Sequence, residues 1–127
     1  MILIDIGNTN IVFALSINKK LKKITRIDTN QEIHKLNKVI SKIIKNFINE
    51  NYLKKSKIAI ISSVVPNINS LIIKILKNFK IKGCFLKSRD ILPFLKIDYN
   101  LNEIGADRIA NSIAVIDSKI KNSIVID

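Results

Sequence analysis

The sequence contains few of the residues that break or cross-link a chain. Its 127 residues include three glycines, two prolines, one cysteine and no tryptophan. Because Cys84 is the single cysteine, an intrachain disulfide and a cysteine-based metal cluster are excluded, and its apolar neighbours indicate a small buried side chain. The single histidine, His34, lies among Lys and Glu residues, and we interpret it as a solvated helix residue.

Long apolar runs are also missing. The uninterrupted apolar stretches fall far short of the roughly 18 residues that a membrane span needs. An acid, Asp5, stands where a signal peptide would carry basic residues. We therefore expect a cytoplasmic protein with no membrane partner. The length and the hydrophobic content of 47% suit one domain with one core.

Acidic residues are scarce relative to basic ones. The chain has 10 Asp and Glu residues against 22 Lys and Arg residues, a formal net charge of +12. Such a charge generally favours nucleic-acid binding. Here it comes almost entirely from Lys spread over polar helix faces, without a recognisable nucleic-acid-binding motif, and frequent Ile, Asn and Lys point to an A/T-rich coding sequence. We expect no specific nucleic-acid partner; a basic nucleic-acid-binding domain stays an alternative supported by charge alone.

Hydrophobic periodicity predicts an alternation of strands and helices. β-Branched runs bounded by turn residues predict strands at residues 2–6, 10–17, 22–27, 57–65, 82–87 and 122–127, and a further extended piece at 94–99. Apolar residues at three- and four-residue spacing predict helices at residues 31–52, 68–79 and 103–118. Thr29 or Asn30 is expected to cap the first helix, and Asn102 the third.

This order predicts an α/β fold with a mixed sheet. Three antiparallel strands come first, and helices and strands then alternate, so that crossover helices cover the sheet. The arrangement resembles a ribonuclease-H-like or actin-like ATPase domain, in which the first hairpin turn holds ATP phosphates. Residues 1–120 are expected to form this domain, and residues 121–127 to be the first strand of a second domain.

The first candidate site is the tight turn between the first two predicted strands. Gly7 allows a ligand to approach the backbone, because it has no Cβ atom. Asn8, Thr9 and the turn amides can donate hydrogen bonds to phosphate oxygens. Asp5 can bind Mg²⁺ directly or through water. The alternative is an ordinary Asn/Gly hairpin turn without a ligand.

The second candidate site is the stretch Gly105-Ala-Asp-Arg108 at the opening of the third predicted helix. Arg108 can bind an anionic group while Asp107 accepts a proton. The alternative is that Asp107 only complements the helix dipole, as acids in a first turn commonly do. Two of the three glycines, Gly7 and Gly105, fall within the two candidate sites, which favours a role in close backbone approach.

Three motifs in this order resemble those of the type III pantothenate kinases of bacterial coenzyme A biosynthesis. They are Asp5-Ile-Gly-Asn-Thr-Asn-Ile-Val12, Ile61-Ser-Ser-Val-Val-Pro66 and Gly105-Ala-Asp-Arg108. The resemblance covers the whole chain. It implies a two-domain enzyme of the acetate and sugar kinase, Hsp70 and actin superfamily, which works as a homodimer and transfers the ATP γ-phosphoryl group to the terminal hydroxyl of pantothenate. A non-catalytic relative, such as a transcriptional activator-like protein, is the alternative.

The resemblance also implies roles for individual residues. The ATP-binding residues would be Asp5, Ile6, Gly7, Asn8, Thr9, Asn10, Ile11 and Val12, with Asp5 near Mg²⁺. The pantothenate-binding residues would be Tyr99, Gly105, Ala106, Asp107 and Arg108, with Asp107 as the general base that takes the hydroxyl proton. Asp127 would help to bind a monovalent cation, K⁺ or NH₄⁺. Ser62 to Pro66 has no chemical role in this scheme beyond shaping a strand end.

The length of the chain adds one expectation. Members of the family are much longer, and in them the strand corresponding to 122–127 leads into a Gly-Thr-rich second phosphate motif and a second domain. We therefore expect this chain to be the N-terminal half of such a kinase. That half would lack part of the ATP cleft and be inactive alone.

Overall fold

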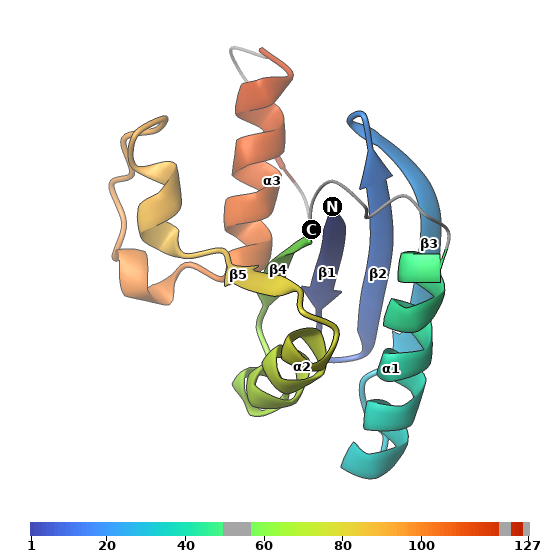
Figure 1. Ribbon diagram of the computed structural model, residues 1–127. Coiled ribbons are helices and arrows are strands. Elements are labelled where there is room, and N and C mark those ends of the chain that lie inside the picture. The colour runs from blue at the N-terminus through green and yellow to red at the C-terminus, as the bar shows by residue number, and fades with distance from the viewer. Residues whose placement is uncertain (50–56, 120–122, 126–127) are drawn as a thin grey trace.

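The computed structural model describes residues 1–49, 57–119 and 123–125. These residues form a mixed sheet in the order β3-β2-β1-β4-β5 (Figure 1). The strands are β1 (Ile2–Ile6), β2 (Asn10–Ile17), β3 (Lys20–Asp28), β4 (Ile58–Ser63) and β5 (Lys82–Phe85). The first three are antiparallel to one another, whereas β4 runs parallel to both β1 and β5. The predicted α/β fold with its mixed sheet is confirmed.

Helices connect the parallel strands, because a parallel pair needs a crossover connection. The helices are α1 (Ile33–Asn49), α2 (Pro66–Asn78) and α3 (Ala106–Asp117), with two short 3₁₀ helices, η1 (Ser88–Ile91) and η2 (Leu101–Glu103). In Figure 1, α1 and α2 lie together in the lower part of the view, and α3 stands apart from them. No helix in the described part of the chain is both long enough and apolar enough to cross a membrane.

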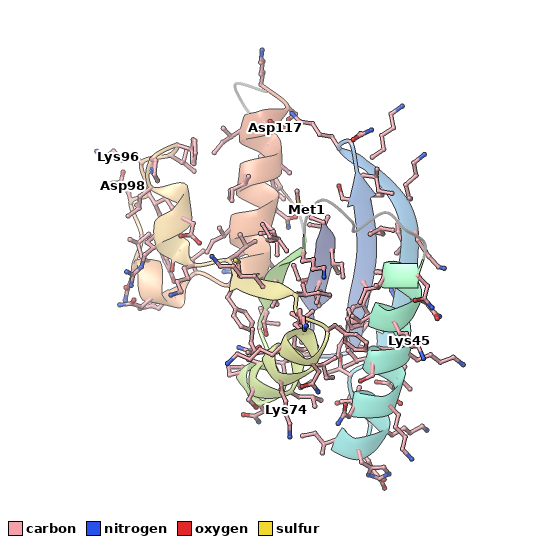
Figure 2. The ribbon with its side chains drawn as sticks, viewed as in Figure 1. Met1, Lys45, Lys74, Lys96, Asp98 and Asp117 are labelled. Carbon is pink, nitrogen blue, oxygen red and sulfur yellow. The ribbon has the colours of Figure 1, made fainter. Side chains whose placement is uncertain are left out.

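The two faces of the sheet have different neighbours. Ile2, Ile4 and Ile6 alternate along β1 and are buried in the main core, together with the apolar faces of α1 and α2. The intervening residues, Leu3 and Asp5, belong to the opposite face of the strand. Lys45 and Lys74 point outward from α1 and α2 in Figure 2, as expected for the polar sides of amphipathic helices. One face of the sheet therefore carries the core and leaves the other available for a site.

The third helix begins later than its apolar pattern predicts. Asn100 accepts a hydrogen bond from the N–H of Asn102 at 3.1 Å, and its side-chain amide donates to Oε1 of Glu103 at 2.6 Å. These bonds form the separate turn of η2, and α3 starts only at Ala106, after Gly105. The predicted start at Glu103 and the predicted cap at Asn102 are wrong, because local side-chain bonds compete with the helix there.

Other local predictions also need correction. The carbonyl oxygen of Glu32 accepts from the N–H groups of Lys35 and Leu36, so α1 begins after Glu32 and not at a Thr29 or Asn30 cap. Residues 94–99 form no strand. Cys84, on β5, is half-buried where full burial was expected. Residues 123–125 lie outside helix and strand, and 122, 126 and 127 are outside the described residues, so the strand of a second domain stays a prediction.

Candidate active site

The turn between β1 and β2 is held by hydrogen bonds from within and from Thr29, the residue that follows β3. The N–H of Gly7 donates to the carbonyl oxygen of Asn10 at 2.9 Å and closes the turn. Thr29, only 7% exposed, donates from Oγ1 to the carbonyl oxygen of Gly7 at 2.8 Å and from its N–H to the carbonyl oxygen of Thr9 at 2.9 Å. A Cβ atom at position 7 would lie 3.2 Å from the Asn10 oxygen, so glycine permits this close turn.

A cavity of about 470 Å³ lies between the sheet and α3. Its floor consists of two rows of side chains on paired strands, Ala14–Leu3–Ile60 and Val12–Asp5–Ser62. Its other wall includes Asp107, Ala110 and Asn111 from α3. The cavity therefore brings Asp5 of the first candidate site together with Asp107 of the second.

The two carboxylates occupy different settings in this cavity. Asp5 is exposed on β1, between two buried isoleucines of the same strand. Asp107 is half-buried in the first turn of α3, and its Oδ1 accepts from the N–H of Arg108 at 2.8 Å. This bond leaves Oδ2 available for a proton or a ligand. Two carboxylates facing one cavity can serve in metal binding and in proton transfer.

Gly105 leaves room for the Asp107 carboxylate. A Cβ atom added at Gly105 would collide with Oδ1 of Asp107. The backbone of Gly105 has φ −64° and ψ 150°, which other residues also adopt, so close approach and not an unusual conformation accounts for glycine here. The contact that favours glycine here comes from the Asp107 side chain, so the role in a ligand site that the sequence suggests for Gly105 stays a prediction.

A second cavity, of about 630 Å³, adjoins the first. It is lined by the η1 and η2 segments and by the start of α3, including Lys87, Arg89, Gly105 and Ala106. Val64 and Leu86 line both cavities, so the two spaces are neighbours. The beginning of α3 therefore presents residues to both of them.

The Ser-Ser-Val-Val-Pro motif lies where β4 passes into α2. Oγ of Ser63 donates to Oδ1 of Asn69 at 2.7 Å and accepts from the N–H of Val65 at 3.2 Å. Pro66 occupies the first turn of α2, where its missing N–H costs no helical hydrogen bond. Ser63 and Pro66 thus shape the end of the strand, as the sequence indicated, whereas Ser62 lines the first cavity.

Several residues of the predicted sites lie elsewhere. Ile6 and Ile11 are fully buried in the main core, so their side chains serve packing. Tyr99 is 60% exposed and donates from its hydroxyl to Oε2 of Glu103 at 3.1 Å, and neither Tyr99 nor the exposed Arg108 lines the two cavities. Asp127 is outside the described residues. The ligand contacts expected of these residues stay predictions.

Sequence reasoning assigned no site role to Thr29, Ser62 and Asn111. Thr29 was considered only as a helix cap, yet it holds the turn of the first candidate site. Ser62 pairs with Asp5 in the strand register and shares its cavity, which no local pattern indicates. Asn111 follows Asp107 by four residues, the spacing that places two side chains on one helix face, and this spacing was the available signal.

The donor atoms of the first cavity fit a magnesium ion. Mg²⁺ is commonly bound through one or two carboxylates, with waters and substrate phosphates as its remaining ligands. Asp5 and Asp107 provide two carboxylates on one cavity. No group of three or more His, Cys, Asp or Glu residues able to hold a metal occurs within residues 1–49, 57–119 and 123–125.

Comparison with known proteins identifies the family of this chain. The family model of type III pantothenate kinase matches residues 1–127. The chain belongs to this family. Among similar type III pantothenate kinases, that of Thermosipho melanesiensis is 38% identical over 130 residues, covering 99% of this chain and 49% of the relative. That of Ehrlichia canis is 35% identical over 122 residues, covering 90% of this chain and 44% of the relative.

The matches cover nearly all of this chain but less than half of each relative. The chain spans about half the length of the curated relatives that it matches. Both relatives are named type III pantothenate kinase.

Proposed function

We propose that this chain provides the phosphate-binding turn and the general base of an enzyme that phosphorylates pantothenate with ATP. The observation that supports the proposal is the common cavity of Asp5 and Asp107 in a chain of the type III pantothenate kinase family. The product is 4'-phosphopantothenate, an early intermediate of coenzyme A biosynthesis. The relatives are named for this activity. The reaction needs one carboxylate near Mg²⁺ and one that acts as a base, and Asp5 and Asp107 are two such groups.

The nucleotide phosphates bind at the β1–β2 turn. Asn8 and Thr9 are exposed there, and the turn amides add further donors for phosphate oxygens. Thr29 keeps the turn in one conformation through its bond to the Gly7 carbonyl. Asp5 would hold Mg²⁺ there, directly or through water, and the ion would neutralise phosphate charge. The turn therefore orients the terminal phosphate toward α3.

Pantothenate occupies the larger neighbouring cavity, with its terminal hydroxyl directed toward Asp107. Its carboxylate is an anion, and Lys87 and Arg89 line this cavity with positive charge. Gly105 and Ala106 line this cavity at the start of α3, and the next residue, Asp107, lines the smaller one. This placement gives each substrate one cavity and brings their reacting groups together at the boundary.

The reaction transfers the γ-phosphoryl group from ATP to the hydroxyl oxygen of pantothenate. A bond forms from that oxygen to phosphorus, the bond from phosphorus to the ADP oxygen breaks, and Asp107 accepts the hydroxyl proton. Because phosphoryl transfer has a loose transition state, alignment of the two substrates contributes more than the strength of the base. The rigid sheet and α3 provide this alignment.

The proposal includes parts of the enzyme that the matched residues do not contain. A second domain completes the ATP cleft, and two subunits form a cytoplasmic homodimer. Asp127 contributes to a site for K⁺ or NH₄⁺.

The test is an assay of the full-length gene product with ATP, Mg²⁺, pantothenate and either K⁺ or NH₄⁺. Mass spectrometry should detect 4'-phosphopantothenate, and its formation should stop when ATP is omitted. A folded full-length protein that forms no phosphorylated product under these conditions would refute the proposed activity.

A further inference from the structure

The hydroxyl group of Ser62 is buried without a hydrogen-bond partner. Ser62 is 7% exposed, and its Oγ has no partner among the described residues and almost no contact with solvent. Buried polar atoms in proteins nearly always have a partner, and one that is left unpaired costs about 1–3 kcal/mol. The adjacent Ser63, in contrast, both donates and accepts hydrogen bonds. An alanine at position 62 would avoid this cost, so a hydroxyl there requires another explanation.

The neighbour that can use this hydroxyl is Asp5. The two residues are directly paired in the parallel register of β1 and β4, and both line the 470 Å³ cavity. Paired residues on adjacent strands are separated by about 4.8 Å and project to the same face of the sheet. Rotation of both side chains about χ1 can therefore bring Oγ within hydrogen-bond distance of the carboxylate. Asp5 is exposed in the ligand-free chain and has room to make this movement.

We propose that Ser62 is a positioning residue that donates a hydrogen bond to the Asp5 carboxylate when nucleotide phosphates occupy the cavity. In the ligand-free protein the carboxylate remains solvated and the hydroxyl unpaired. Nucleotide binding draws Asp5 inward over Ser62, and a charge-assisted hydrogen bond then fixes its orientation. The Ser62 hydroxyl thus gains its hydrogen-bond partner only in the ligand-bound state. The inference rests on the proposed function for the identity of the nucleotide site.

The experiment compares Ser62→Ala, Ser62→Thr and Ser63→Ala in the full-length protein. Three quantities are measured: the melting temperature without ligand, the dissociation constant of Mg·ATP by calorimetry, and the KM for ATP and kcat of pantothenate phosphorylation. For Ser62→Ala we expect an unchanged or higher melting temperature and Mg·ATP binding weaker by about tenfold, the loss of one hydrogen bond to a charged group. The KM for ATP should rise more than kcat falls. Ser62→Thr keeps the hydroxyl and should restore binding, whereas Ser63→Ala should lower the melting temperature.

The outcomes separate this inference from the proposed function. If the wild-type protein does not phosphorylate pantothenate, the proposed function fails, and the Mg·ATP affinities still decide the role of Ser62. Equal Mg·ATP affinity in wild type and Ser62→Ala would overturn the inference. So would a large fall in the melting temperature of Ser62→Ala, because it would mean that the hydroxyl is already paired in the ligand-free protein.

Discussion

Asp5 on β1 and Asp107 in the first turn of α3 line the same cavity, one from the sheet and the other from the helix. These two residues lie far apart in the sequence, one near the start of the chain and the other in the last described helix. The parallel pairing of β1 with β4, and the return of the chain through η1 and η2, bring them together. This relationship places the turn proposed to bind phosphate next to a candidate base, and it supports the proposed transfer reaction.

The first prediction contrasts two glycines. Gly105→Ala should displace the Asp107 carboxylate, because the new methyl group collides with Oδ1 of that residue. We expect kcat to fall while stability changes little. Gly83→Ala should instead destabilise the fold by about 1–3 kcal/mol through overpacking, because its Cβ would lie 2.8 Å from Cδ1 of Ile73 and 3.0 Å from Cδ1 of Leu76. Turnover and urea unfolding measure the two effects. Wild-type turnover in Gly105→Ala would contradict the assignment.

The second prediction concerns Asp5. Asp5→Asn removes the negative charge with little change in shape, and we expect the KM for ATP to rise by about tenfold or more. Asp98→Asn is the control, because Asp98 is an exposed acid on a loop away from both cavities (Figure 2). A normal dependence of rate on ATP concentration in Asp5→Asn would remove Asp5 from the nucleotide site.

The third prediction concerns the hydroxyl that holds the turn. Thr29→Val keeps the shape of the side chain but loses the bond from Oγ1 to the Gly7 carbonyl. We expect a loss of about 0.5–1.5 kcal/mol in the free energy of unfolding and weaker ATP binding, because the turn is less well held. Thr25→Val, the same change in the interior of β3, serves as the control. Unchanged ATP affinity in Thr29→Val would mean that the turn does not depend on this bond.

The fourth prediction concerns the second cavity. Arg89→Gln should raise the KM for pantothenate and leave the KM for ATP near its wild-type value, because Arg89 lines only the larger cavity. Lys96→Gln is the charge-matched control on an exposed loop position (Figure 2). Equal effects on both KM values, or no effect on either, would argue against the placement of pantothenate in that cavity.

Much of the fold could be predicted because each element carries a local pattern. The apolar face of α1 repeats at helical spacing, and the turn at Gly7 is flanked by β-branched runs, so both follow from neighbouring residues. The start of α3 could not be predicted in this way. The apolar pattern extends toward Glu103, but side-chain hydrogen bonds from Asn100 form a competing turn. Such competition depends on three-dimensional geometry.

The motifs of the site could be predicted from the sequence, but the contacts between residues of different elements could not. Asp5, Asp107 and Gly105 each stood out from their immediate surroundings in the sequence. The position of Ser62 beside Asp5 depends on strand register, and the bond from Thr29 to Gly7 depends on how β3 ends next to the turn. A single sequence contains no direct record of such contacts. They follow only once the sheet is assembled.

The most direct test of the account is the turnover of Asp107→Asn in the full-length protein, compared with Asp117→Asn. Asp117 ends the same helix, is exposed and lines neither cavity (Figure 2). If Asp107 takes the proton from pantothenate, Asp107→Asn should lower kcat by at least about a hundredfold, while Asp117→Asn keeps wild-type turnover. Nearly unchanged kcat in Asp107→Asn, with intact folding, would contradict the central claim.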